Sequence, residues 1–177
     1  MSAPLPKRLF QFTKACATFI LLTVTVIIIA LAFTFLLSNI EALYREKVIV
    51  IIYDCGNIIE NVAKSKFEII SRKFIVKCDI KIQNEICELL LNLDVPLPVT
   101  VLLEDGTIRA VIIGVPSDNL WNQIMRKLTL PSKAFLAFSV PEELLPWHCA
   151  SCPFHLVEEL RDLSEEEIKS IYKILNI

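Results

Sequence analysis

Glycine is scarce in this sequence, with three in 177 residues. A loop that binds phosphate through its backbone N–H groups depends on closely spaced glycines, so a nucleotide site of that type is excluded. The formal net charge is −2 and no basic face stands out, so we expect no nucleic-acid partner. No catalytic triad or pair of catalytic carboxylates is evident, and we interpret Glu158 and Glu159 as part of a solvated helix surface.

Charge is absent over one long stretch, residues 15–39. Apolar residues make up 54% of the chain and the mean hydropathy is +0.57, which is high for an ordinary soluble domain. The stretch matches the roughly 20 residues that a helix needs to cross a bilayer. A cleaved signal peptide is the alternative, but its apolar region has only about 7–15 residues. We therefore predict a transmembrane helix over residues 15–38.

The charges that flank this stretch predict its orientation. Lys7, Arg8 and Lys14 precede it, whereas the basic residues that follow it are balanced by acidic ones. Because basic residues gather on the cytoplasmic side of a membrane helix, we expect residues 1–14 in the cytoplasm. The sequence thus predicts a single-pass protein of the cell membrane with an extracytoplasmic C-terminal domain.

A β-hairpin is the strongest local signal in that domain. Two apolar runs flank Asp105-Gly106, a pair that favours a tight hairpin turn. Pro96 and Pro98 precede the first run, and Pro98 stands where a strand begins and a ladder donor can be spared. Because both strands are almost wholly apolar, we expect them in a sheet that is covered on both faces.

Further elements surround this hairpin. We expect strands at 47–53 and 74–80, and helices at 57–73, 83–93 and 117–128. This order gives a mixed sheet flanked by helices, an α/β domain over residues 47–130, joined to the membrane helix by a linker at 39–46. For residues 131–177 we predict a helical C-terminal extension. It has a first helix at 154–163 and a second one opened by the capping-box pattern of Ser164 and Glu167.

This order of elements, together with Cys55, Pro98 and Gly114, resembles the thioredoxin fold in its minimal form. Cys55 stands just after the first strand, where the family has the first cysteine of its Cys-x-x-Cys pair. Pro98 resembles the family's cis-proline beside that cysteine, and Gly114 closes the last strand. The resemblance implies a thioredoxin-like mixed sheet and a thiol site at Cys55 and Pro98.

The sequence departs from the family at two positions. Ile58 stands where the family has its second cysteine, and Ile49 stands where it has a buried acid. Ordinary dithiol turnover is therefore not expected at Cys55. A helix N-terminus favours a thiolate there, whereas Asp54 opposes it, and an inert buried cysteine is the alternative.

A second cysteine site lies in the C-terminal extension, where Cys149 and Cys152 form a Cys-x-x-Cys motif. In a redox interpretation, this spacing lets the pair close a small disulfide, Trp147 shields it and His148 moves a proton. In a metal interpretation, the two cysteines bind zinc together with one or both of His148 and His155. In a structural interpretation, the pair is a disulfide that ties down the tail. We expect no other cofactor.

Five cysteines follow the membrane helix, in a compartment where disulfides persist. Because five is odd, one thiol is expected to stay free or to pair with another chain, and Cys55 is the natural candidate. Cys78 and Cys87 are interpreted as core residues. A bond between those two, or from either to Cys55, stays open.

Two functional hypotheses follow. In the first, the chain is a membrane-anchored thioredoxin-like protein that exchanges disulfides with protein substrates. Cys149 attacks, Cys152 resolves, and Cys55 beside Pro98 forms a second or docking site. In the second, it is a non-catalytic binding or scaffold module for a membrane-associated protein partner, with a disulfide or zinc stabilising its tail.

Overall fold

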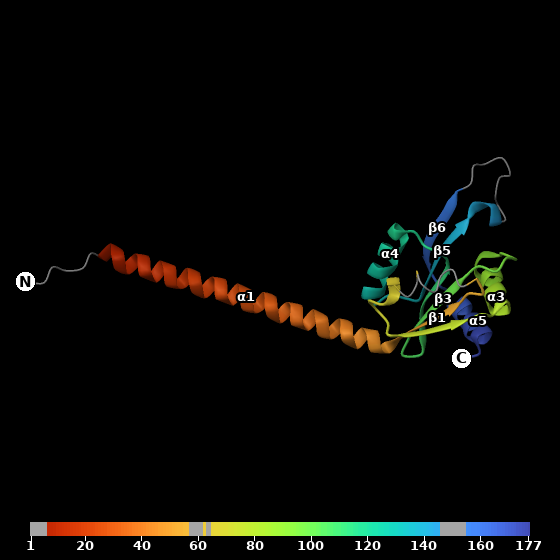
Figure 1. Ribbon diagram of the computed structural model, residues 1–177, viewed down its shortest axis with the longest axis horizontal. Coiled ribbons are helices and arrows are strands. Elements are labelled where there is room, and N and C mark those ends of the chain that lie inside the picture. Colours follow the sequence, from red (N-terminus) through yellow and green to blue (C-terminus); the bar gives the residue numbers. More distant parts are fainter. Residues whose placement is uncertain (1–6, 57–61, 63–64, 146–154) are drawn as a thin grey trace, which may run out of the picture. The chain divides into compact units, whose positions relative to one another are not determined.

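The computed structural model describes residues 7–56, 62, 65–145 and 155–177 (Figure 1). The chain divides into two compact units, Met1–Leu43 and Tyr44–Ile177. The second unit, which we call the domain, carries the β-sheet.

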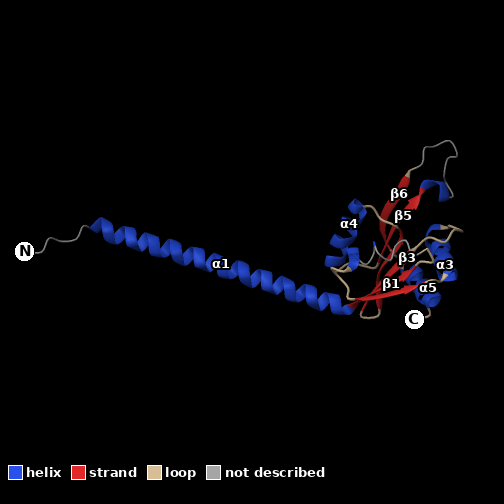
Figure 2. Ribbon diagram, in the orientation of Figure 1, coloured by secondary structure: helices blue, strands red, loops and turns tan. Residues whose placement is uncertain are grey.

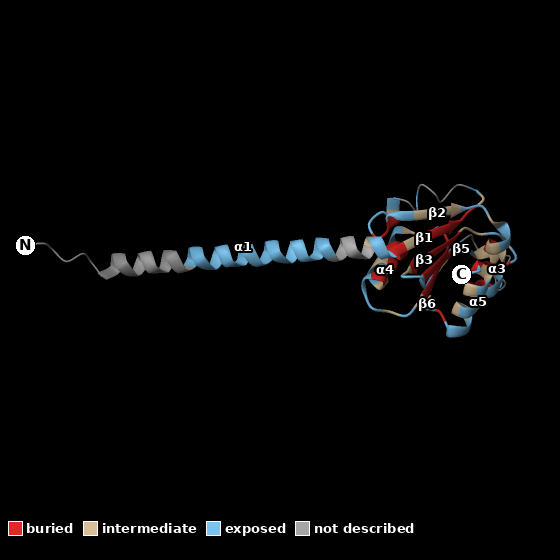
Figure 3. Cartoon of the chain, turned by 90° about the horizontal axis from the view of Figure 1, so that it is seen from below, coloured by how far each residue is buried: buried red, intermediate tan, exposed pale blue. Residues whose placement is uncertain are grey.

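The first unit is built on a single long helix, α1, which runs from Lys7 to Lys47. Its segment Phe19–Asn39 is long and apolar enough to cross a membrane, and its side chains are exposed (Figure 3). The hydroxyls of Thr23 and Thr25 donate to helix carbonyls one turn back. This arrangement suits a lipid environment, where polar groups need partners within the protein. The segment can serve as a membrane anchor or as a signal sequence.

The domain is organised on a mixed sheet (Figure 2). The described strands are β1 Val48–Tyr53, β2 Lys73–Lys77, β3 Val99–Glu104, β4 Thr107–Gly114, β5 Phe135–Pro141 and β6 Leu156–Asp162. Their order is β2-β1-β3-β4-β5-β6. β1 pairs with β2 and β4 pairs with β5 in parallel, whereas the other neighbours are antiparallel.

Helices cover both faces of this sheet, as the apolar hairpin predicts. The described helices of the domain are α3 Ile80–Leu91, α4 Asp118–Thr129, the 3₁₀ turn η1 Glu142–Leu144, and α5 Glu165–Leu175. α3 and α5 lie on one side and α4 on the other (Figures 1 and 3). β1 shows why two cores form: Ile51 and Tyr53 pack in one apolar cluster, and Val50 and Ile52 pack in the other. Successive strand residues point to opposite faces, so a strand buried on both faces is apolar throughout.

The hairpin prediction is confirmed. β3 and β4 pair around Asp105 and Gly106, whose φ angles are +50° and +78°. Positive φ at both central residues matches the right-handed twist of the flanking strands, and Asp-Gly tolerates it.

The predicted helical extension at 131–177 is corrected by the structure. Residues 135–141 and 156–162 form β5 and β6, which extend the sheet beyond β4. The helix expected at 154–163 is therefore wrong over residues 156–162. β6 is an edge strand with charged residues among apolar ones, and such a pattern is easily taken for a helix surface. The capping box of Ser164 and Glu167 is confirmed at the start of α5.

Gly114 is the residue that allows β5 to approach β4. Its φ is +79°, and a Cβ at this position would overlap the carbonyl oxygen of Ser139 on β5. A glycine is required because only a residue without a side chain fits both the backbone conformation and the close contact.

Candidate functional site

Four strand ends meet at one edge of the sheet. Because β1 and β4 are both antiparallel to β3, the carboxyl ends of β1, β2, β4 and β5 all lie at this edge. We call this end of the sheet the carboxyl edge; the name refers to the row of strand ends and not to an edge strand. It is formed by residues 54–56, 78–79, 115–117, 141–145 and 155–156. In open α/β sheets this is the edge outside which ligands bind.

A disulfide between Cys55 and Cys78 joins the segments that follow β1 and β2. The strand register pairs Tyr53 with Lys77, and the Asp54 N–H donates to the Lys77 carbonyl at 3.0 Å. The Cα atoms of the two cysteines are consequently 4.4 Å apart. Cys55 is half-buried and Cys78 is exposed, so solvent reaches this bond.

The expectation that Cys55 stays free is therefore wrong, and so is the placement of Cys78 in the core. The sequence pattern predicts strands at 47–53 and 74–80, but it does not show that their carboxyl ends lie side by side. That adjacency follows from parallel pairing across a connection. The bond that forms is one of those left open for Cys55.

Cys87 is a free thiol in α3, with no exposed surface. Burial raises the pKa of this thiol, and the smaller effect of a hydrogen bond with the backbone of Leu97 lowers it. A buried thiol with a raised pKa forms little thiolate and is chemically inert. The interpretation of Cys87 as a core residue is thus confirmed.

Pro98 lies next to the cysteine segment, as the resemblance implies. The register of β1 and β3 pairs Tyr53 with Val99, which places Pro98 beside Asp54, and the Pro98 carbonyl accepts the Gly114 N–H at 2.8 Å. The cis geometry is wrong, however, because no peptide bond among the described residues is cis. A trans proline fits here because it precedes the first strand residue, where no ladder donor is needed.

Two acidic side chains shape the turns on either side of the disulfide. Asp54 is buried, and its Oδ1 accepts the Gly56 N–H at 2.8 Å. Asp79 is the N-cap of α3, where its Oδ1 accepts the Ile82 N–H at 3.1 Å. Cys78 therefore stands directly before the cap of a well-formed helix. Sequence reasoning missed this position, although an aspartate before an amphipathic run is a recognisable N-cap signal.

The electrostatics at this position are mixed. The N-terminus of α3 carries partial positive charge, which favours a thiolate at Cys78 on reduction, while the adjacent carboxylates of Asp54 and Asp79 oppose one. Desolvation, followed by the negative charge of Asp79, raises the pKa of Tyr53 at the end of β1.

The Cys-x-x-Cys motif, with Trp147 and His148, lies outside the described residues. The described residues on either side of it are Leu145 and His155, and the His155 carbonyl accepts the Glu142 N–H at 2.8 Å. Register pairing of Pro141 with Leu156 places both ends at the carboxyl edge. In the sequence, Cys149 and Cys152 lie between these two ends, which are at β5 and β6, whereas the Cys55–Cys78 disulfide follows β1 and β2.

The zinc hypothesis stays a prediction. In the part of the chain that the structure describes, no group of three or more possible ligands comes together. His155 is described and exposed, but Cys149, Cys152 and His148 are not.

Glu158 holds three elements together near the same edge. Its carboxylate accepts the Ser117 N–H at 2.7 Å, the Ser117 hydroxyl at 2.6 Å and the Ser139 hydroxyl at 3.0 Å. Burial alone raises the pKa of Glu158, but the hydrogen bonds from Ser117 and Ser139 outweigh it, so the pKa lies below its ordinary value. Its interpretation as solvated helix surface is wrong, because residues 156–162 are a strand whose side chains meet α4.

Comparison with protein-family models, curated protein sequences and solved structures finds no match. Within the described residues, the structure by itself shows an α/β domain with a mixed six-stranded sheet.

Proposed function

We propose that the chain is a membrane-anchored, thioredoxin-like protein that exchanges disulfides with protein substrates. The observation that carries this proposal is the shared carboxyl edge. An accessible disulfide, Cys55–Cys78, lies there with Pro98 beside it, and both ends of the segment that carries Cys149 and Cys152 lie farther along the same edge, at β5 and β6.

The thioredoxin-like part of the proposal is supported by the order of elements and by their direction. β1 and β2 are parallel, β3 and β4 form an antiparallel hairpin, and α4 follows the hairpin. β5, β6 and α5 are then additions at the far side of β4.

In the proposed chemistry, the Cys149 thiolate attacks a substrate disulfide and a substrate thiolate leaves. Cys152 then attacks the mixed disulfide and releases the second substrate thiolate. A Cys149–Cys152 disulfide remains, and two electrons have passed to the substrate. The reverse sequence oxidises a substrate dithiol.

A protein substrate is favoured by the exposed apolar side chains at this edge. Ile80, Val115 and Leu156 are 52%, 42% and 54% exposed, and each follows or begins a strand there. They are spread along this edge from β2 to β6, and exposed apolar side chains are suited to contact with another polypeptide.

Turnover by the purified full chain tests the proposal. With dithiothreitol as the reductant and a disulfide-bonded peptide as the substrate, we expect catalysis above the uncatalysed rate. Cys149→Ser abolishes it, and Cys152→Ser traps a mixed disulfide with the substrate. Cys87→Ala is the matched control, because it removes a buried thiol, and it should leave turnover unchanged. No catalysis, or catalysis unaffected by Cys149→Ser, would show the proposal to be wrong.

The second candidate is a non-catalytic binding module. It is favoured by one observation: Cys55 is already bonded to Cys78, and the carboxylates of Asp54 and Asp79, next to the two cysteines in the chain, disfavour thiolates and hence exchange. A chain that shows no turnover, yet holds Cys149 and Cys152 in a stable bond under native conditions, would favour this alternative.

Membrane orientation is part of the proposal. With residues 1–14 in the cytoplasm, protease added to intact cells should cleave the domain, and permeabilisation should not be needed. Protection of the domain in intact cells would reverse the proposed orientation.

A further inference from the structure

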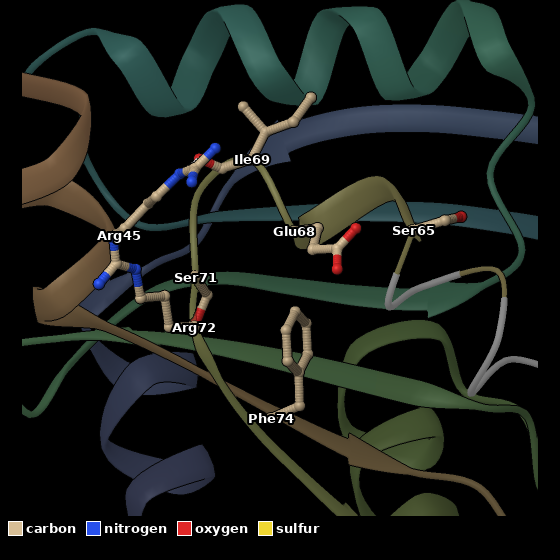
Figure 4. A pocket seen from close by; sticks show the side chains of 7 residues that line it. All are labelled: Arg45, Ser65, Glu68, Ile69, Ser71, Arg72 and Phe74. Carbon is tan, nitrogen blue, oxygen red and sulfur yellow. Dashed lines mark hydrogen bonds between the residues drawn. The ribbon is translucent and has the colours of Figure 1, made fainter. Parts of the chain in front are cut away.

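A cavity of about 670 Å³ opens at the opposite edge of the sheet, next to the residues that precede β1 and β2. Figure 4 shows the side chains that line it. They include Arg45, Arg72, Glu68 and Phe74. Because β1 and β2 are parallel neighbours, the residues before them, Arg45 and Arg72, are brought together from positions far apart in the sequence.

Arg45 is held in place, and its hydrogen-bonding capacity is only partly used. Its Nε donates to the Ile69 carbonyl at 2.6 Å, which fixes the guanidinium group, while neither Nη atom has a hydrogen-bond partner among the described residues. The Ser71 hydroxyl, in contrast, is committed to the Val48 carbonyl at 2.6 Å. Among the described residues, the ion pairs involve cations other than Arg45 and Arg72.

Two guanidinium groups without carboxylate partners favour an anionic ligand with several oxygens. A guanidinium group presents its N–H donors in a planar fork, which matches the oxygens of phosphate. In Figure 4 the two arginines lie on one side of the cavity, and Glu68 lies on the other. Glu68 repels a free dianion, but it can accept a hydrogen bond from a headgroup hydroxyl. The lining therefore fits a phosphodiester that carries a donor better than it fits inorganic phosphate.

The length of the intervening chain limits the distance between Arg45 and the apolar span. Arg45 stands six residues after Asn39, where the span ends, so it is at most about 22 Å from it even along a fully extended path. Phospholipid headgroups form the layer of about 5–7 Å that borders each side of the hydrocarbon region. If α1 anchors the protein, headgroup phosphates are the anions present at highest concentration near Arg45.

We propose that this cavity binds the phosphate group of a membrane phospholipid, with Arg45 and Arg72 donating to its oxygens. The inference depends on the proposed anchoring by α1, and it is independent of thiol exchange. Its consequence is that the lipid fixes one edge of the domain at the membrane while the carboxyl edge stays available to substrates.

Binding can be measured on the full chain in a neutral detergent. The probe is dihexanoylphosphatidylglycerol, whose affinity is read from the shift in thermal unfolding as its concentration rises. Dihexanoylglycerol, which lacks the phosphate, and inorganic phosphate are the comparison ligands. We expect the phospholipid to stabilise the chain at concentrations at least about tenfold lower than either, since loss of one charge-assisted hydrogen bond is worth roughly that factor.

Variants connect this binding to the cavity. Arg72→Gln and Arg45→Gln should each weaken phospholipid binding about tenfold, and Arg126→Gln, an exposed arginine on α4, should not change it. The Arg72 side chain is exposed and makes no hydrogen bond to the backbone of the described residues, so its variant keeps the test valid even if Arg45→Gln disturbs folding. Equal binding of dihexanoylglycerol, equal binding of inorganic phosphate, or unchanged affinity in Arg72→Gln would each overturn the proposal. The assay measures thermal unfolding and does not involve thiol exchange or a bilayer. Its result is therefore the same whether or not the chain exchanges disulfides and whether or not α1 anchors it.

Discussion

The Tyr172 hydroxyl on α5 accepts a hydrogen bond from the Ile108 N–H on β4 at 3.0 Å. The same hydroxyl lies 3.4 Å from the Gly106 carbonyl, to which it donates. One phenol thus connects the last helix to the turn of the central hairpin. These contacts join two parts of the domain that are 64 residues apart in sequence.

Replacing Tyr172 by phenylalanine removes only this hydroxyl. Because the Ile108 N–H is then left without its partner, we expect the free energy of unfolding to fall by about 1 kcal/mol. Urea unfolding monitored by circular dichroism measures the change. Ser170→Ala, on the same helix, should have little effect, and an equal loss in both variants would contradict the role of the Tyr172 hydroxyl.

The ion pair between Arg161 and Glu167 should make the free energy of unfolding depend on pH. The two guanidinium Nη atoms reach the two carboxylate oxygens at 2.8 and 3.1 Å. The hydrogen bonds from Arg161 are the largest cause that lowers the pKa of Glu167 from 4.5 to about 2, against the opposing effect of burial. A carboxyl with a depressed folded-state pKa contributes stability above its unfolded-state pKa, and this stability is lost as pH falls from about 4.5 to about 2.

We therefore expect Glu167→Gln to cost about 1–2 kcal/mol at pH 7, a value discounted for the partial exposure of the pair. The difference from the wild type should shrink as pH falls from 4.5 to 2. Unfolding curves at a series of pH values measure this. Glu166→Gln, on the exposed side of the same turn, serves as the control, and a Glu167→Gln effect that stays constant with pH would contradict the prediction.

Glu158 should contribute to stability in the same direction. Its pKa is lowered, so its contribution is complete above the ordinary carboxyl pKa and declines as acid protonates the folded state. Glu158→Gln is expected to cost about 1 kcal/mol at pH 7, because the charge that faces the N-terminus of α4 is lost. Glu159→Gln provides the matched comparison on the exposed side of β6, and the same loss in that variant would count against a specific role for Glu158.

The Cys55–Cys78 bond should be a substantial stabilising link. It closes a loop between cysteines 23 residues apart, for which chain entropy predicts about 3 kcal/mol. The double variant Cys55→Ser/Cys78→Ser should lose about this amount in urea unfolding, and reductant should destabilise the wild type but not the variant. Peptide mapping under non-reducing conditions should recover the two cysteines in one linked fragment. Recovery of both as free thiols would contradict the bond.

Three local features could be predicted from neighbouring residues alone. The length of the uncharged stretch at residues 15–39 predicts the apolar helix. Asp105-Gly106 predicts the hairpin, and Ser164 with Glu167 predicts the start of α5. Each of these signals depends on residues that are close together in the chain, where turn geometry, helix caps and periodicity act.

The contacts between distant segments could not be predicted in this way, because they depend on how the strands pair. The pairing of β1 with β2 brings Cys78 to Cys55, and the addition of β5 and β6 turns Glu158 from a surface residue into a partner of Ser117. An edge strand that alternates imperfectly between charged and apolar residues carries the same local pattern as a helix surface. Only its long-range pairing with β5 distinguishes the two, because the hydrogen-bonding partners of a strand lie elsewhere in the sequence.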